Sequence, residues 1–355
     1  MATEEAAFNG HGLRLMHGDC MEMMKQIPDK SVDLVLTDPP YNIKKADWDK
    51  IDGYIDWCAA WLKECARVLK ENGSPYIWHN DMPQIAQLME RIRRDGLFAY
   101  ISFCIWDKTE IYRARSWANR DPESNGTLRS WFNRCEYCLE FAKTGGVNTA
   151  WNRTGLDQIN SNPECYKPLK EWIAQEKERL RVDDDEIAKA YTEATGKKPY
   201  MLRHYFQNSQ FAIPTKAVWD AVYRPLGFGK EYEELRGEYE ELRYYHRCDK
   251  GHCNVWTRAV LNTAQKESGH PCEKPVDLLQ RIIRVSCRPG GVVLDLFMGG
   301  GSTGVAAIRE DRGFIGIERD TGWFEKAAKR IDKELHGPKQ MDMMSMLEGM
   351  QNGNA

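Results

Sequence analysis

The chain has 355 residues, a formal net charge of -3 and 42% hydrophobic residues. Because a typical domain has about 100–200 residues, we expect one large and one smaller domain with a sizeable core. Binders that hold nucleic acid non-specifically are usually strongly basic, so any surface for a polyanion must be local. Eleven cysteines without an N-terminal apolar signal segment predict free thiols in a reducing cytosol, and no apolar run approaches the roughly 18 residues of a membrane span.

The first part of the chain alternates between strand patterns and helix patterns. Strands are predicted at residues 13–18, 32–37, 76–79, 98–106 and 135–141, and helices at 21–27, 54–69 and 82–93. The polar run 71–74 is expected to stop the helix before it. This alternation is typical of an α/β sheet, in which 135–141 is the last strand of this half.

The strand at 32–37 leads directly into Asp38-Pro39-Pro40-Tyr41. An exocyclic amine on a nucleobase is a poor nucleophile because its lone pair is delocalised into the ring. The Asp38 carboxylate and the Pro39 carbonyl can accept its two N–H bonds and pull the nitrogen toward sp³ geometry. The two prolines stiffen the loop, and Tyr41 can stack on the base. Taken alone, the tetrapeptide could also be only a rigid exit turn.

Basic and aromatic residues interleave without periodicity in the segment 107–134. Such a loop can follow phosphates and wedge into a duplex whose target base is rotated out. The alternative is a solvated surface loop with a few buried aromatic rings. We predict DNA contacts for Lys108, Arg113, Arg115, Trp117, Arg120 and Arg129.

Residues 149–265 have a mainly helical pattern. Helices are predicted at 169–181, 186–194, 200–206 and 215–222, with the acidic run 183–185 and residues 195–196 bounding the second. Three short helices joined by tight turns resemble a helix-turn-helix, and a three-helix packing subdomain is the alternative. We predict target recognition here, with DNA contacts for Lys197, Lys198 and Arg203.

Two smaller patterns follow. Residues 231–243 repeat a seven-residue unit twice, which predicts one charged surface helix, with a dimer contact as the alternative. The His and Cys residues of 246–253 lack the paired Cys-x-x-Cys spacing of a zinc site, so no metal is expected. A loop that leads into a strand at 254–257 accounts for them better.

The C-terminal part has the order strand, glycine-rich turn, helix and strand that is typical of nucleotide binding. The strand at 292–296 leads into a turn containing Gly299 and Gly301, and a later strand ends at Glu318. Glycines permit close backbone approach, and an acid about 20 positions on can hold ribose hydroxyls. A dinucleotide dehydrogenase is the alternative for the loop alone, although the Gly-x-Gly-x-x-Gly pitch is missing. The tail 337–355 is expected to be disordered.

Together these residues resemble the S-adenosylmethionine-dependent DNA amino-methyltransferases of bacteria and phages, over roughly 13–143 and 268–335. The tetrapeptide precedes the glycine loop with a long insert between, which resembles the β group of that family. The resemblance implies a Rossmann-like, doubly wound, circularly permuted sheet of seven mostly parallel strands with a reversed strand at its edge. It divides the chain into a catalytic half (1–148), a target-recognition insert (149–265), a cofactor-binding half (266–336) and a flexible tail (337–355).

The resemblance also implies which residues form the site. Asp38, Pro39, Pro40 and Tyr41 are expected to be catalytic, and no metal is required. Residues 18–20 resemble the family's contact to the cofactor adenine, and 270–275 resemble the segment that lines its methionine side. The expected cofactor-binding residues are Asp19, Cys20, Asp38, His270, Lys274, Pro275, Asp295, Phe297, Gly299, Gly301, Ser302, Thr303, Glu318 and Arg319.

The tetrapeptide begins with Asp38 and continues into Asn42, as is commoner in the family's adenine-N6 members than in its cytosine-N4 members. We therefore expect methyl transfer to adenine N6 in double-stranded DNA after base flipping, with cytosine N4 as the alternative acceptor. Motif order argues against an RNA or protein-glutamine methyltransferase, and the intact acidic and glycine positions argue against a silent DNA-binding module. A homodimer and a cognate restriction endonuclease are further expected partners, in the cytoplasm of a bacterium or a phage-infected host.

Overall fold

The computed structural model describes residues 6–8, 12–108, 134–143, 165–200, 202, 205–206, 211–248, 253–261 and 263–337. Within these ranges the strands form one nine-stranded sheet in the order β1-β2-β9-β8-β3-β4-β6-β5-β7. The strands are β1 (Ala6–Phe8), β2 (Leu13–His17), β3 (Val32–Thr37), β4 (Leu69–His79), β5 (Ala99–Asp107), β6 (Cys135–Ala142), β7 (Val255–Thr257), β8 (Val292–Asp295) and β9 (Gly313–Glu318).

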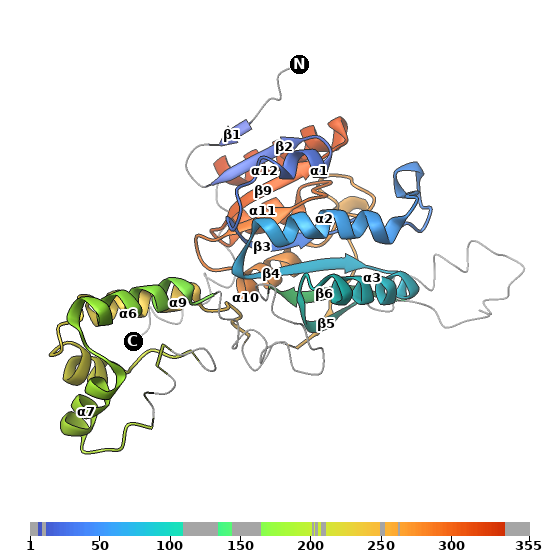
Figure 1. Ribbon diagram of the computed structural model, residues 1–355. Helices are drawn as coiled ribbons and strands as arrows, with labels where there is room; N and C mark the ends of the chain where they lie inside the picture. The colour runs from blue at the N-terminus through green and yellow to red at the C-terminus, as the bar shows by residue number, and fades with distance from the viewer. Residues whose placement is uncertain are drawn as a thin grey trace, which may run out of the picture.

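Helices cover both faces of the sheet (Figure 1). One face packs against α1 (Cys20–Met24), α2 (Tyr54–Val68) and α3 (Met82–Asp95). The other face packs against α10 (Val276–Ser286), α11 (Ser302–Arg309) and α12 (Thr321–His336). Strand β3 is buried along its whole length because it lies centrally between these two layers, which explains its near-continuous apolar sequence. Short helical turns lie at η1 (Asp47–Asp49) and η5 (Thr263–Gln265).

The sheet confirms the predicted doubly wound α/β class and adds detail to it. Nine strands replace the expected seven within the described ranges, because β1 and β7 extend the two edges. The reversed strands are β1 at one edge and β6, which runs antiparallel to β4 and β5 between them. The remaining pairings are parallel, so β3 and β8 end at the same side of the sheet. Circular permutation and the exact domain boundaries stay predictions.

The strand that follows α2 is longer than predicted. Helix α2 ends at Val68, before the polar run 71–74 as expected, but the run itself belongs to β4, which begins at Leu69 and not at residue 76. Its polar neighbours are accommodated at this end of the strand because Lys70 bonds both oxygens of Asp33 at 2.8 Å and Glu71 pairs with Lys30 and Lys143. The paired charges at the start of this strand interrupt its apolar pattern, which is why the strand was predicted to begin later.

The insert contains α6 (Lys167–Leu180), α7 (Asp184–Thr195), α8 (Lys216–Val218), the π-helix η4 (Trp219–Tyr223) and α9 (Tyr232–Leu242). It extends away from the sheet around a core of its own (Figure 1). Asp183 begins α7 with a capping box that also uses Glu186, and Gly196 ends it at a φ of 68°, both as predicted.

The described residues of 200–206 do not form the predicted helix. Tyr205 pairs with Ala212 in an isolated β-bridge, and Phe206 adopts a φ of 59°. The aromatic rings explain this, because Phe206 contacts Phe211 and Tyr223 in the insert core instead of continuing a helix. The helix-turn-helix therefore stays a prediction without its middle helix. Among the described residues, no helix has the length and apolar composition needed to cross a membrane.

Candidate active site

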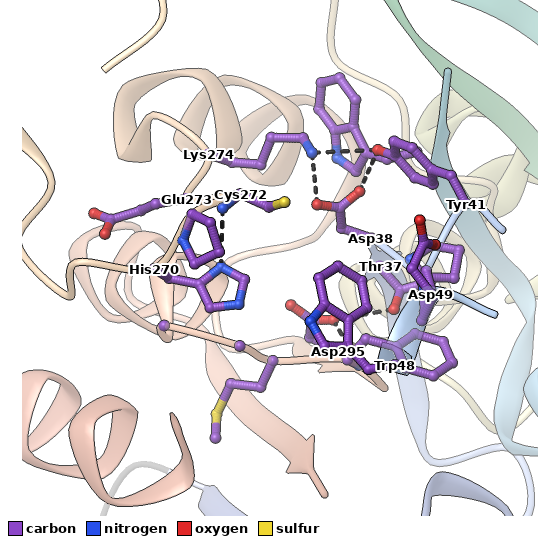
Figure 2. A pocket seen from close by; sticks show the side chains of 18 of the residues that line it. Thr37, Asp38, Tyr41, Trp48, Asp49, His270, Cys272, Glu273, Lys274 and Asp295 are labelled. Atoms are coloured by element: carbon purple, nitrogen blue, oxygen red, sulfur yellow. Dashed lines mark hydrogen bonds and ion pairs between the residues drawn. The ribbon is translucent and has the colours of Figure 1, made fainter. Parts of the chain in front are cut away.

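The tetrapeptide and the glycine-rich turn lie at the same end of neighbouring parallel strands, β3 and β8. Thr37 joins them: its hydroxyl donates to Asp295 at 3.0 Å and accepts the Leu296 N–H at 3.2 Å. Thr303 donates to the other oxygen of Asp295 at 2.6 Å. Both stretches line one cavity of about 1010 Å³ (Figure 2). Two regions more than 250 positions apart in sequence thus form one site.

The tetrapeptide is held rigidly from behind. Tyr54 on α2 donates to the Pro40 carbonyl at 2.8 Å, and Gln84 on α3 donates to the Tyr41 carbonyl at 2.9 Å. The His79 ring stacks on Tyr41 with centroids 4.9 Å apart, and its Nδ1 accepts the N–H groups of residues 80 and 81. Burial lowers the pKa of His79 to about 4, so its imidazole is neutral at pH 7.

The loop after the tetrapeptide is built around the buried Asp49. Its carboxylate accepts the N–H groups of Asn42, Ile43 and Lys45 at 2.7, 3.1 and 3.0 Å. This arrangement leaves two large apolar side chains, Ile43 and Trp48, 46% and 41% exposed where they line the cavity. The loop therefore presents an apolar rim beside Asp38.

Four ionisable side chains form a chain of alternating charge in the cavity wall. Lys274 lies between two carboxylates, with its Nζ 2.5 Å from Asp38 Oδ2 and 3.0 Å from Glu136 Oε1. Lys108 forms an ion pair with the other oxygen of Glu136. Tyr41 donates its hydroxyl toward Asp38 and Glu136, the latter at 2.6 Å. Figure 2 shows Lys274 and Tyr41 next to each other, each reaching a different oxygen of Asp38.

Burial and neighbouring charges shift the pKa values of Asp38, Glu136 and Lys274 in different directions. Burial raises the pKa of Asp38, and the Glu136 charge adds to this while Lys274 opposes it. Burial also acts to raise the pKa of Glu136, but the charges of Lys274 and Lys108 outweigh it and lower that pKa to about 2. The pKa of Lys274 is raised because the two carboxylates overcome its burial. Glu136 and Lys274 are therefore charged at pH 7.

The expected cofactor residues surround the other end of the cavity. Glu318 at the end of β9 accepts the Gly299 N–H and the Asp320 N–H, each at 2.8 Å, so this acid also fixes the glycine turn. Asp19 caps α1 by accepting the Met21 N–H at 2.9 Å. Those that line the cavity are Asp19, Cys20, Asp38, His270, Lys274, Asp295, Phe297, Gly299, Ser302, Thr303, Glu318 and Arg319.

Two of the predicted cofactor residues stand behind the cavity wall. Pro275 precedes the first turn of α10, and Gly301 begins α11 at a φ of 78°. A Cβ on Gly301 would lie 3.1 Å from the Cβ of Ala327, so glycine is required there for helix packing. Burial raises the pKa of Asp295 to about 6, against three hydrogen-bond donors that lower it. Pro275 and Gly301 therefore shape the backbone around the turn, whereas Asp295 lines the cavity.

The predicted DNA contacts are distributed differently. Lys108 is buried in the cavity wall beside Glu136 and not on the surface. Lys197 and Lys198 are exposed just after α7, which lies in the part of the insert that extends away from the sheet in Figure 1, and neither lines the cavity. The predicted contacts at positions 113, 115, 117, 120, 129 and 203 lie outside the described residues, as do positions 249–252 and the tail from 338. Among the described residues, no cluster of three or more His, Cys, Asp or Glu could hold a metal.

Sequence reasoning missed three residues of the site. Glu136 is the second residue of a predicted strand and carries no motif, and Glu140 in the same strand gives a similar charge signal. Thr37 ends a strand as an ordinary β-branched residue, and Asp49 lies in a loop without a pattern. Lys274 was expected beside the cofactor, whereas the structure places its ammonium on Asp38.

A nucleotide-type sheet with a carboxylate, a proline carbonyl and a glycine turn around one cavity defines a class of group-transfer enzyme acting on amino nitrogens. A family model described as DNA methylase, and covering N6 and N4 methylases, matches residues 32–329. The chain belongs to this family of DNA methylases. The resemblance found in the sequence is thereby confirmed.

Individual proteins are similar along almost the whole chain. The DNA adenine methyltransferase YhdJ of Escherichia coli (strain K12) is 26% identical over 342 residues, which cover 94% of this chain and 87% of that protein. The type II methyltransferase M.HinfI of Haemophilus influenzae is 24% identical over 355 residues, covering 94% and 72%. A solved structure described as an M1.HpyAVI–SAM complex is 17% identical, with a TM-score of 0.47 and coverage of 90% and 98%.

Proposed function

We propose that this DNA methylase transfers a methyl group from S-adenosylmethionine to the N6 amino group of adenine in double-stranded DNA, after the base has flipped into the cavity. One observation carries this proposal: Asp38 and Pro39 line the same cavity as Gly299 and Gly300 of the glycine turn. Two acceptors for an amine therefore stand next to a nucleotide-type site. The similarity to a protein described as a DNA adenine methyltransferase supports adenine as the acceptor.

The residues at the β8 end of the cavity fit the cofactor. Gly299 and Gly300 line the cavity without a side chain, and glycine is needed at position 300 because a Cβ there would lie 2.7 Å from the Cβ of Ser268. Glu318, Asp19 and His270 provide polar groups around this end of the cavity, as an adenosine and an amino-acid moiety require. Bound there, S-adenosylmethionine supplies a methyl group on a positively charged sulfur.

At the β3 end, the chain's own residues orient and activate the amine. The Asp38 carboxylate accepts one N–H bond and the Pro39 carbonyl accepts the other, which concentrates the nitrogen lone pair toward the donor. The amine becomes cationic as the new N–C bond forms, and it then loses a proton readily. Asp38 must be ionised to accept, so activity falls as the pH drops below its raised pKa.

Aromatic and aliphatic side chains can exclude water from the cavity when a base is bound. The Tyr41 ring, already stacked on His79, offers a rigid apolar surface for the base, and Trp48 and Ile43 line the entrance. Contacts of this kind offset the free energy that is lost when a base leaves its stack in the duplex. The insert and the segment 107–134 are the proposed DNA-reading parts, since a base-reading surface is needed beyond the cavity.

Cytosine N4 is the second candidate acceptor, because the family covers both N6 and N4 methylases. Plasmid DNA methylated by the purified protein and digested to nucleosides separates the two by mass spectrometry. We expect N6-methyladenine. Detection of N4-methylcytosine in its place would contradict the adenine assignment, and sequencing that detects modified bases would give the recognition sequence.

A further inference from the structure

Both oxygens of the Asp38 carboxylate already have hydrogen-bond donors within the protein. Lys274 bonds Oδ2 at 2.5 Å, and the Tyr41 hydroxyl bonds Oδ1. A carboxylate offers about four lone-pair sites, so an amino group that binds Asp38 shares the carboxylate with these two donors and weakens its bond to at least one of them. The weakened donor is a buried ammonium or a buried hydroxyl, and either is costly to leave without a good acceptor.

Glu136 is within reach of both of these donors. Its Oε1 lies 3.0 Å from Lys274 Nζ and 2.6 Å from the Tyr41 hydroxyl. The Tyr41 hydroxyl has a single proton, so it can donate to only one of the two carboxylates at a time. The same atom of Glu136 is therefore the alternative acceptor for the two groups that occupy Asp38.

The charges around this group favour such an exchange. Lys108, Glu136, Lys274 and Asp38 alternate in sign, and their side chains are 10%, 7%, 9% and 21% exposed. When Asp38 turns to a substrate, Lys274 remains paired with Glu136, and the Trp78 ring lies 5.1 Å from its Nζ. Without Glu136, the ion pair left to this buried lysine among the residues that the structure describes would be with Asp38 itself.

We propose that Glu136 is a positioning residue for methyl transfer: it takes over the Lys274 ammonium and the Tyr41 hydroxyl when a substrate amino group binds Asp38. The inference rests on the amino-methyl transfer proposed above and holds for adenine or cytosine. Glu136 does not touch the amine in this scheme. Its effect reaches the reaction through the two donors that it shares with Asp38.

The groups that face Asp38 come from several elements. Lys274 precedes α10, Glu136 is on β6, Lys108 follows β5 and Tyr41 belongs to the same loop as Asp38. The buried Asp295 at the end of β8 and the neutral His79 at the end of β4 complete the set. Of these, Glu136 is the anion in contact with both donors, so its removal should change both the rate and its dependence on pH.

The test compares Glu136→Gln with the wild-type enzyme in single-turnover methylation of plasmid DNA across pH. We expect kcat to fall about 10- to 100-fold, with the Kd for S-adenosylmethionine within about twofold of wild type. The acid limb of the kcat profile should move to lower pH, because the charge that helps to raise the pKa of Asp38 is gone. A kcat within twofold of wild type with an unmoved acid limb would overturn the proposal.

Two further variants separate positioning from a general loss of structure. Glu136→Asp keeps the charge, and we expect it to recover at least a tenth of wild-type kcat with the acid limb at its wild-type position; equal loss in both variants would contradict the proposal. Glu140→Gln is the matched control, since Glu140 is also buried on β6 but bonds His246 and Tyr244 away from the cavity. A loss in Glu140→Gln as large as in Glu136→Gln would also contradict it.

The identity of the methylated base is read from the same samples. If the product is N4-methylcytosine, the adenine assignment fails, while the ratio of variant to wild-type rates still decides the role of Glu136. The two proposals therefore fail through different measurements.

Discussion

The cavity wall and the helical insert use charged residues in opposite ways. In the cavity, Glu136 and Lys274 are less than 10% exposed and exchange hydrogen bonds with Asp38 and Tyr41. In the insert, pairs such as Arg236 and Glu240 sit one helical turn apart with 51% and 40% of their side chains exposed. Exposed pairs of this kind contribute at most a few tenths of a kcal/mol, whereas a buried pair is costly to break.

This difference has a functional meaning. The insert gains its stability from a core of stacked rings, such as Tyr166 on Phe211 at 4.3 Å and Trp219 on Tyr223 at 5.0 Å. Its charges keep the surface solvated. The cavity instead carries its charges inside, where their energies depend strongly on protonation and on ligands. Loss of a buried charge in the cavity should therefore change the chemistry, whereas loss of an exposed ion pair in the insert should change stability only slightly.

The largest effect is expected for Asp38→Ala. This change removes an acceptor for the amine, so methyl transfer should fall by about 10³-fold or more. Binding of S-adenosylmethionine should stay nearly intact, because the turn at 299–301 is fixed by Glu318 and not by Asp38. Rates of DNA methylation together with calorimetric titration of the cofactor check both parts. A variant that methylates at the wild-type rate would refute the role of Asp38.

The second effect is a pH-dependent stability difference. The folded pKa of Glu136 is about 2, below its ordinary 4.5, so its charge stabilises the fold above pH 4.5 and this contribution is lost as pH falls toward 2. The shift corresponds to roughly 3 kcal/mol. The free energy of unfolding of Glu136→Gln should therefore be roughly 3 kcal/mol lower than that of the wild type at pH 7, and the difference should be much smaller near pH 3. Urea unfolding at both values measures this, and a difference independent of pH would count against it.

The smallest effect is expected in the insert. Asp183→Ala removes the cap of α7, whose side chain accepts the Glu186 N–H at 2.9 Å, and should cost about 1 kcal/mol of unfolding free energy. Methylation chemistry in the cavity should not change. Glu193→Ala, an exposed position in the same helix, is the control and should change stability by less than about 0.5 kcal/mol. Chemical denaturation compares the two, and equal losses would show that the cap contributes nothing.

Sequence patterns could predict what depends on local order. The helix from Tyr54 and the strand Val32–Thr37 follow from apolar periodicity, and the start of α7 follows from Asp183 and Glu186. The cavity could be placed because the ends of parallel strands meet at one side of a sheet. These inferences need only neighbours in the chain or a general rule of topology.

The features of the site and the insert that the sequence did not predict depend on contacts between distant segments. Nothing near Glu136 in the sequence indicates that Lys274, 138 positions away, will share its charge. The motif at 270–275 predicted that Lys274 lies beside the cofactor. Its side chain is long enough to reach either end of the cavity, and in the structure it pairs with Asp38. The rings around Phe206 likewise overrode a helical pattern that was locally consistent. Long side chains and aromatic cores are decided by tertiary packing.

The way in which the insert joins the sheet has an evolutionary consequence. The chain leaves the sheet after β6 and returns through β7, and these two strands flank β5 on either side. The last residue of β6, Ala142, lies opposite Ala99 at the start of β5, whereas Val255 begins β7 opposite Ile105 near the end of β5. Both junctions thus lie on the side of the sheet away from β8, so the insert can be lengthened or shortened without changing the strand pairs that carry the glycine turn.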